Sequence, residues 1–317
     1  MCSAMASKSP RSGFAALIGA PNVGKSTLLN RLAGAKLAIV SPKAQTTRGR
    51  IVGVVSRPQG QVAFIDTPGL HPAARGLNRR MVDVSLHALS DADLVLFTVE
   101  PPAKSGGPIS EVNRFILDRL GEAKKPALLV INKIDKVAKP RLLPLIESYR
   151  GEFPFAEVVP VSAKTGGGID ELIALAIAQL PEGAPMFDEE TLTDQAEKAL
   201  AAEYVREQVL RHCRDEIPYS TAITVDSFDE SEREPRPGDV GKPLAGLVRI
   251  HATIHLERDS QRSIVIGKGG QMLKTIGTDA RGAIEKLLGA HVYLSLHVRV
   301  EPRWTERPAA LRKLGYE

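Results

Sequence analysis

The chain has 317 residues, of which 43% are hydrophobic and 25% are charged, which is ordinary for a soluble globular protein with room for two domains. No apolar run approaches the ~20 residues of a membrane span, and the first twelve residues lack the apolar stretch of a secretory signal. The two cysteines, Cys2 and Cys213, argue against a disulfide framework and favour a reducing compartment, so we expect a cytoplasmic protein.

Charge is distributed unevenly along the chain, although the formal net charge is only +5. Residues 1–184 carry 23 basic and 15 acidic side chains, residues 186–239 carry 6 and 15, and residues 241–316 carry 13 and 6. A basic terminal segment favours an anionic partner, with RNA as the leading candidate. On charge alone, a solvated basic face is an equal alternative.

The first part of the chain alternates between strand-like and helix-like segments. We expect strands at residues 14–17, 50–55, 61–65, 94–99, 127–131 and 158–161, and helices at residues 26–32, 78–89, 110–120, 141–149 and 169–180. The continuous apolar runs are typical of strands that are buried on both faces. After a flexible N-terminus of residues 1–12, the pattern predicts an α/β domain over residues 13–181, with a mostly parallel sheet.

The residues PEGAP at positions 181–185 break the last helix, and a linker over residues 182–192 separates this domain from a second unit. We expect helices at residues 193–214, 263–266 and 271–288, and strands at residues 219–228, 246–257 and 291–300. Thr193 is the expected N-cap of the first of these helices. Residues 230–242 are polar and are predicted to form a loop. The result is a smaller α+β domain over residues 193–317, including a C-terminal tail.

Residues 19–26, with the sequence GAPNVGKS, fit the phosphate-binding pattern G-x-x-x-x-G-K-S/T between a strand and a helix. Glycines let backbone N–H groups point at a phosphate, and the helix N-terminus adds positive potential. Lys25 can reach the β- and γ-phosphates, and the Ser26 hydroxyl suits Mg²⁺. The predicted phosphate-binding residues of this loop are Asn22, Val23, Gly24, Lys25, Ser26 and Thr27.

A second motif, DTPG, occupies residues 66–69 directly after a predicted strand. Asp66 is placed to hold the metal, and the N–H of Gly69 can contact the γ-phosphate, so that loss of this phosphate would release the following segment. One of the two adjacent threonines, Thr46 and Thr47, should complete the Mg²⁺ shell; we favour Thr47, and Thr46 remains an alternative. The predicted switch residues are Thr46, Thr47, Asp66, Thr67, Pro68, Gly69 and Leu70.

A third motif, NKID at residues 132–135, predicts which base is bound. The Asp135 carboxylate can accept hydrogen bonds from the N1–H and the exocyclic amine of guanine, whereas adenine lacks this donor pair. Lys133 can cover the base with its stem, and Ala163 can offer its N–H to the guanine O6. The predicted guanine-binding residues are Asn132, Lys133, Asp135, Ser162, Ala163 and Lys164, so the expected nucleotides are GTP and GDP.

Hydrolysis is predicted to be slow without assistance. Leu70 follows Gly69, where many GTPases place a glutamine that orients water, and a leucine cannot do this. Asn22 is a candidate ligand for a monovalent cation, K⁺, that could replace an arginine finger. This remains a hypothesis at the level of sequence.

The basic C-terminal segment contains the loop VIGKGG at residues 265–270, followed by a predicted helix. A G-x-x-G loop between two helices brings backbone close to a nucleic-acid backbone, beside an apolar groove for single-stranded bases. The order of elements predicts a KH domain of the second topological type. The predicted RNA-binding residues are Ile264, Ile266, Gly267, Lys268, Gly269, Gly270 and Lys274.

The chain resembles the Era family, bacterial GTPases with a G domain and a C-terminal KH domain. The resemblance depends on AQTTR at residues 44–48, DTPGLH at 66–71, residues 265–273 and the ending LRKLGY at 311–316. It implies binding to small-subunit ribosomal RNA near its 3′ end, a role in maturation of the small ribosomal subunit, and an apolar residue at the position of Leu70. It also implies peripheral association with the inner membrane. The acidic loop over residues 229–239 is where the chain departs from the family.

The leading hypothesis is therefore a monomeric GTP-hydrolysing switch that binds ribosomal RNA. An RNA-binding scaffold with a structural, slowly hydrolysed nucleotide is the first alternative. A GTPase for a membrane or metal-transport task, whose C-terminal domain binds a protein, is the second.

Overall fold

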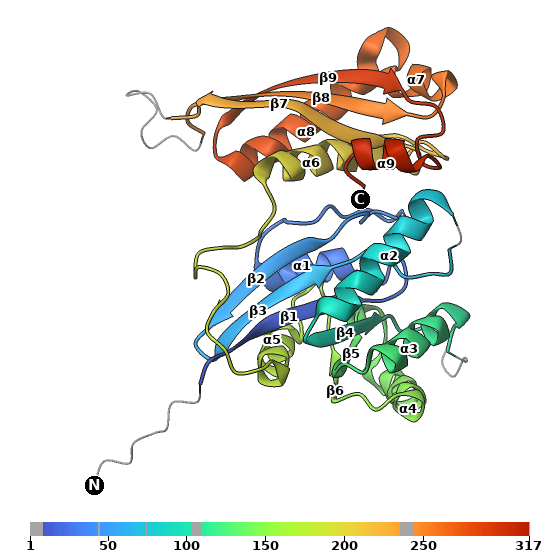
Figure 1. Cartoon of the computed structure of the whole chain (residues 1–317), viewed down its shortest axis with the longest axis vertical. Coiled ribbons are helices and arrows are strands. Elements are labelled where there is room, and N and C mark those ends of the chain that lie inside the picture. Colours follow the sequence, from blue (N-terminus) through green and yellow to red (C-terminus); the bar gives the residue numbers. More distant parts are fainter. Residues whose placement is uncertain (1–8, 44, 74, 103–108, 235–243, 317) are drawn as a thin grey trace. The chain divides into compact units, whose positions relative to one another are not determined.

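The computed structural model describes residues 9–43, 45–73, 75–102, 109–234 and 244–316 (Figure 1). The chain divides into two compact units. The first comprises Met1–Ala38, Thr47–Ala74 and Met81–Asp194, and the second comprises Ile39–Thr46, Arg75–Arg80 and Gln195–Glu317. Most of the expected flexible N-terminus, Ala44 of the AQTTR segment and residues 235–243, which include the second part of the acidic loop, lie outside the described residues.

The first unit is built around a six-stranded sheet with the order β2-β3-β1-β4-β5-β6. Neighbouring strands are parallel, except that β2 and β3 form an antiparallel hairpin. The strands are β1 (Arg11–Ile18), β2 (Ile51–Arg57), β3 (Gly60–Asp66), β4 (Leu94–Val99), β5 (Ala127–Ile131) and β6 (Glu157–Pro160). The helices are α1 (Lys25–Ala33), α2 (Gly76–Asp91), α3 (Glu111–Ala123), α4 (Leu142–Glu152) and α5 (Ile169–Gln179), with short 3₁₀ turns η1 (Ile134–Lys136) and η2 (Lys139–Arg141).

Helices cover both faces of this sheet (Figure 1). Two large apolar clusters lie between the helices and the sheet. Helices α1 and α5 contribute Leu28 and Leu172 to one cluster, and α2, α3 and α4 contribute Val82, Ile116 and Tyr149 to the other. Strand β4 is buried at every position because both of its faces are covered. The predicted α/β domain with a mostly parallel sheet is confirmed.

The second unit contains a three-stranded sheet in which β7 (Ala222–Glu232) pairs antiparallel and β9 (His291–Val300) pairs parallel with the central β8 (Leu247–Leu256). Its helices are α6 (Glu197–His212), α7 (Asp259–Ile266), α8 (Gln271–Leu288) and α9 (Pro308–Lys313), with the turn η3 (Lys268–Gly270) before α8. Helices α6 and α8 pack around a common core with the sheet, which includes Val209, Ile250 and Ile276. The order of these elements is that of the predicted type II KH domain.

Three local predictions in the second half of the chain are wrong. Thr193 is not an N-cap, because α6 begins at Glu197 after Ala196, while the Thr193 hydroxyl donates to the carbonyl of Val52 at 2.6 Å. The predicted loop at residues 230–242 begins too early, since β7 continues to Glu232 through a register shift. Helix α7 begins at Asp259, four residues before its predicted start. Among the described helices, none has the combined length and apolar character that crossing a bilayer requires.

Candidate nucleotide and RNA sites

The phosphate-binding motif forms the turn between β1 and α1. Gly24 has φ 95°, and a Cβ at this position would lie 2.5 Å from the amide nitrogen of Asn132, so only glycine fits here. The Lys25 ammonium is buried and donates to the carbonyls of Gly19 and Ala20, both at 3.0 Å. Burial lowers the pKa of Lys25 to about 8, against the opposing attraction of Asp66. An anionic phosphate in this loop would favour the charged form of the lysine.

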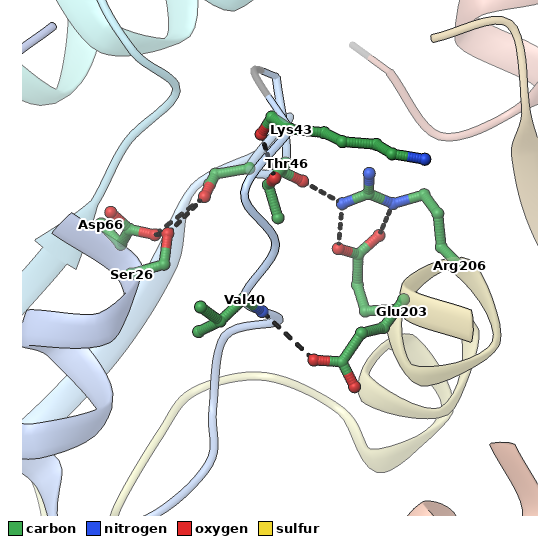
Figure 2. A network of polar contacts seen from close by, with 9 residues as sticks. Ser26, Val40, Lys43, Thr46, Asp66, Glu203 and Arg206 are labelled. Carbon is green, nitrogen blue, oxygen red and sulfur yellow. Dashed lines mark hydrogen bonds and ion pairs between the residues drawn. The ribbon is translucent and has the colours of Figure 1, made fainter. Parts of the chain in front are cut away.

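Three oxygen-bearing side chains converge beside this loop (Figure 2). The Ser26 hydroxyl donates to Asp66 Oδ2 at 2.7 Å and lies 2.6 Å from the hydroxyl of Thr47, which donates to the same carboxylate oxygen at 3.1 Å. Asp66 is fully buried, and its Oδ1 has no hydrogen-bond partner among the described residues. Burial raises the pKa of Asp66, and Lys25 and the two hydroxyls oppose this rise.

Hard oxygen ligands and a buried carboxylate oxygen without a partner fit a magnesium ion. The sequence left two threonines open for this position, and the structure brings only one of them to the cluster. The hydroxyl of Thr46 instead donates to the carbonyl of Lys43 at 2.7 Å.

The switch segment after β3 is held against the first unit by several bonds. The Thr67 hydroxyl donates to the carbonyl of Leu17 at 2.8 Å, and the carbonyl of Pro68 accepts from Ser85 at 2.9 Å. The N–H of Leu70 donates to the carbonyl of Gly19 at 3.1 Å, so that Gly69 lies alongside the phosphate-binding loop. The Leu70 side chain is fully buried in the apolar core, and it therefore cannot reach a hydrolytic water.

Asn132 connects the three loops that the sequence predicted for the nucleotide. Its side-chain amide donates to the carbonyl of Val23 at 2.9 Å, and its Oδ1 accepts from the N–H groups of Lys133 at 2.8 Å and Ala163 at 3.0 Å. The N–H of Ala163, which we expected to meet the guanine O6, thus has a partner within the protein. Its role toward the base stays a prediction.

Asp135 is exposed and accepts a hydrogen bond from the Ser162 hydroxyl at 2.6 Å. This bond lowers the pKa of Asp135, so the carboxylate is ionised and can accept further hydrogen bonds. The ammonium of Lys133 donates to the carbonyl of Asn22 at 2.6 Å and forms an ion pair with Glu100. This arrangement places the stem of Lys133 between the phosphate loop and the NKID loop.

Arg31 was not among the predicted site residues, although it holds the loop that contains Ala163 and Lys164. The guanidinium of Arg31, on α1, donates to the carbonyl of Ala163 at 3.0 Å and to that of Lys164 at 2.6 Å. Arg31 lies more than 130 positions along the chain from both of these residues, and no local pattern marks such a contact.

In the second unit, the G-x-x-G loop forms the turn between α7 and α8. Gly267 has φ 73°, and a Cβ there would lie 2.7 Å from the Cβ of Met272, so a side chain would push the loop away from α8. The N–H of Gly270 donates to the carbonyl of Gly267 at 3.1 Å and closes the turn. Lys268 and Gly269 lie within this turn, and Gly270 and Lys274 line a groove beside α8.

The groove has a volume of about 370 Å³ and lies between α8 and β9. Its lining residues are Gly270, Leu273, Lys274, Gly277, Thr278, Arg281, Leu294 and Leu296. Of the seven predicted RNA-binding residues, Gly270 and Lys274 line this groove. The other five, Ile264, Ile266, Gly267, Lys268 and Gly269, do not line it, and Ile264 is 53% exposed. Sequence reasoning missed Arg281 and the two leucines of β9. The signal for Arg281 was its position on the helix face that also carries Gly270, Lys274 and Gly277, whereas no comparable signal marked the leucines of β9.

Two family models match the chain in the regions just described. A model described as "50S ribosome-binding GTPase" matches residues 14–133, and a model described as "KH domain" matches residues 232–305. The first match contains the phosphate loop, the switch segment and Asn132, and the second contains the G-x-x-G loop and its groove.

The relatives match both of these regions, because each match covers nearly the full length of both chains. GTPase Era of Geobacter metallireducens is 50% identical over 306 residues, covering 96% of this chain and 98% of the relative. A crystal structure of Aquifex aeolicus Era bound to GDP·AlF4⁻ has a TM-score of 0.86 at 38% identity, covering 96% and 99% of the two chains. A crystal structure of Era with MgGDPNP and nucleotides 1506–1542 of 16S ribosomal RNA has a TM-score of 0.87 at 38% identity, covering 97% and 99%. With both domains matched over nearly its full length, this chain belongs to the Era family of GTPases.

Proposed function

We propose that this GTPase uses its nucleotide cycle to control binding of small-subunit ribosomal RNA near its 3′ end, and that it thereby assists maturation of the small ribosomal subunit. The observation that carries the proposal is the likeness, over 97% of the chain, to Era in complex with MgGDPNP and nucleotides 1506–1542 of 16S ribosomal RNA. The open groove beside the G-x-x-G loop supports it independently.

The phosphates of GTP or GDP are assigned to the loop between β1 and α1 and to the switch glycine. The ligands are the backbone or side chains of Asn22, Val23, Gly24, Lys25, Ser26, Thr27 and Gly69. Mg²⁺ is assigned to Ser26, Thr47 and Asp66, whose oxygens converge. When bound, this ion neutralises the charge that develops on the phosphate oxygens.

The base is assigned to the pocket formed by Asn132, Lys133, Asp135, Ser162, Ala163 and Lys164. The Asp135 carboxylate, which accepts a hydrogen bond from the Ser162 hydroxyl that lowers its pKa, has further acceptor capacity for the N1–H and the exocyclic amine of guanine. Asn132 holds the three loops at fixed positions. The protein therefore meets the base with a preorganised acceptor, which favours guanine over adenine.

Hydrolysis is slow in the free protein, because the buried Leu70 offers no group to orient water. We assign Asn22 as a ligand of a K⁺ ion that stabilises the transition state. Turnover of GTP measured in K⁺ and in Na⁺ at equal ionic strength tests this role. Faster turnover in K⁺ supports it, and equal rates contradict it.

The RNA is assigned to the second unit, with residues 193–317 as the RNA-binding domain, residues 13–181 as the GTPase domain and residues 182–192 as the linker between them. The G-x-x-G loop and Lys268 contact the RNA backbone, and the groove beside Lys274 accepts bases. Single-turnover release of phosphate, measured with and without an RNA that contains the 16S 3′ end, tests the switch. A nucleotide that is never turned over under either condition would support the scaffold alternative.

We further propose that the protein acts as a monomer in the cytoplasm with peripheral association at the inner membrane. The small number of cysteines supports a reducing compartment. Sedimentation of the purified protein tests the monomer, and co-sedimentation with anionic vesicles tests the membrane association.

A further inference from the structure

The switch segment before Thr47 is held by the helix that opens the KH unit. Residues 39–46 belong to the second unit, and Ile39 is 1% exposed within its apolar core. The N–H of Val40 donates to Glu207 Oε1 at 3.2 Å (Figure 2). The ammonium of Lys43 donates to the carbonyl of Cys213, directly after the end of α6. Residues 39–46 are thus attached to α6 and the core of the second unit at their beginning, through Ile39 and Val40, and in their middle, through Lys43.

The attachment at its end depends on Arg206, whose side chain is 1% exposed. Its guanidinium is held by Glu203 through Nε at 2.8 Å and Nη2 at 2.5 Å, and the same Nη2 donates to the carbonyl of Thr46 (Figure 2). Nη1 is buried and has no hydrogen-bond partner among the described residues. Burying a charged side chain costs free energy unless the charge is paired. Packing alone would therefore not require an arginine at this buried position, where it needs Glu203 as its partner.

The carbonyl that Arg206 holds belongs to the peptide bond that leads into Thr47. A peptide unit is planar, so an arginine that fixes the carbonyl oxygen of Thr46 also fixes the orientation of the Thr47 nitrogen. The side chain of a β-branched threonine has few rotamers. Only the backbone angles and χ1 of Thr47 then separate this anchor from the hydroxyl that meets Ser26 and Asp66. The hydrogen bond from Arg206 to Thr46 lies within the second unit, and the contacts of Thr47 with Ser26 and Asp66 lie within the first. The peptide bond between residues 46 and 47 connects the two sets of contacts.

We propose that Arg206 is a positioning residue for Thr47, so that helix α6 of the KH unit sets how well the GTPase domain holds Mg²⁺ with GTP. The inference rests on the proposed role of Thr47 as a Mg²⁺ ligand and extends it to the group that aims this ligand. A switch threonine contributes to binding while the γ-phosphate and Mg²⁺ are both present. The switch segment is released after the γ-phosphate is hydrolysed. Loss of Arg206 therefore weakens binding of GTP more than binding of GDP. By linkage, a nucleotide that engages Thr47 also favours the arrangement of α6 that holds Thr46.

The test compares Arg206→Met with Arg206→Lys and with Arg211→Met in the full chain without RNA. Arg211 is the matched control, since it lies on the same helix, is 56% exposed and pairs only loosely with Glu207 at 3.6 Å. The measured quantities are the dissociation constants of GDPNP and GDP and the Mg²⁺ concentration that gives half-maximal GTP turnover. For Arg206→Met, we expect the affinity for GDPNP relative to GDP to fall about tenfold, the effect of losing one hydrogen bond to a charged group. The required Mg²⁺ concentration should rise in parallel.

Arg206→Lys keeps a charged donor and should recover part of the preference for GDPNP, while Arg211→Met should match the wild type. An Arg206→Met protein with the wild-type ratio of the two affinities and the wild-type Mg²⁺ requirement would overturn the inference. An equal loss for both nucleotides would also overturn it, because that is the result of general damage. If Arg206→Met does not fold, Arg206→Lys and Glu203→Gln, which loosens the guanidinium, carry the same comparison. A wild type without any Mg²⁺-dependent preference for GDPNP would instead contradict the proposed role of Thr47.

Discussion

The side-chain amide of Asn132 donates a hydrogen bond to the carbonyl of Val23 at 2.9 Å, across 109 positions of the chain. One buried side chain thereby connects the loop assigned to the phosphates with the loop assigned to the base. Through its Oδ1 it also holds the third loop at Ala163.

Asn132→Ala should therefore damage both stability and nucleotide binding. It leaves buried backbone groups at Val23 and Ala163 without their partner, which is expected to cost about 2–4 kcal/mol of unfolding free energy. Nucleotide affinity should fall by roughly 100-fold, since each 1.4 kcal/mol is a factor of ten. Urea unfolding and titration with a fluorescent GDP measure the two effects. Asn113→Ala is the control: it removes a bond to the Tyr149 hydroxyl at 2.6 Å and should lower stability while sparing GDP affinity.

Asp135→Asn should change the base that is preferred. An amide can donate where the carboxylate only accepts, so it matches the O2 carbonyl of xanthine in place of the exocyclic amine of guanine. Competition between GDP and XDP measures the change, and an unaltered preference for GDP would show that Asp135 does not read the base. Because the pKa of Asp135 lies below its ordinary value, we also expect GDP affinity to show no loss from this group between pH 8 and pH 5.

Leu70→Gln should not create a fast GTPase. The side chain at this position is fully buried among apolar residues, so a glutamine would be desolvated there without reaching the phosphates. We expect unchanged or lower GTP turnover and a loss of roughly 2–4 kcal/mol in unfolding free energy. Leu70→Met conserves volume and should cost less than about 1.5 kcal/mol. A clear rise in turnover for Leu70→Gln would mean that this segment moves out of the core when GTP binds.

Arg281→Ala and Lys274→Ala should each weaken RNA binding, because both basic side chains line the groove between α8 and β9. If each contacts one phosphate, the dependence of the affinity on salt should lose about one unit of slope per variant. Filter binding over a series of salt concentrations measures this. Lys286→Ala, which removes an exposed charge from the same helix away from the groove, should keep the wild-type slope.

His255 should make the KH unit less stable in acid. It is 5% exposed, its Nε2 lies 2.9 Å from the Thr224 hydroxyl, and burial lowers its pKa below the ordinary 6.5. The charged groups that act on it are Asp226 and Glu301, which raise the pKa, and Arg299 and Lys313, which lower it. The unfolded chain binds this proton at higher pH than the folded chain, so stability is lost as the pH falls through about 6.5.

Urea unfolding of the full chain at pH 7.5, 6.5 and 5.5 measures this dependence. His255→Gln retains a polar group for Thr224 but cannot be protonated, so its unfolding free energy should decrease less over this range. Equal slopes in the two proteins would exclude His255 as a contributor.

Many elements of this protein are predictable because their signals are local. The runs at residues 94–99, 127–131 and 291–300 predict strands with the observed ends, since short apolar or alternating runs of strand length that are rich in β-branched residues favour a sheet. The motifs at residues 19–26, 66–69 and 132–135 each place their chemistry at the end of a strand, and the parallel order of β1, β3, β4 and β5 brings these ends to one edge of the sheet.

What the sequence determined by itself was therefore the pair of folds, the guanine nucleotide and the Era family, because motif spacing and hydrophobic periodicity are encoded within short segments. Packing of the folded chain brought Thr47 rather than Thr46 to Ser26 and Asp66, placed the Thr193 hydroxyl against the carbonyl of Val52, and brought Arg31 and Arg206 to carbonyls more than 130 positions away. Each of these outcomes depends on which buried donor meets which acceptor once the elements pack. No pattern of neighbouring residues carries that information.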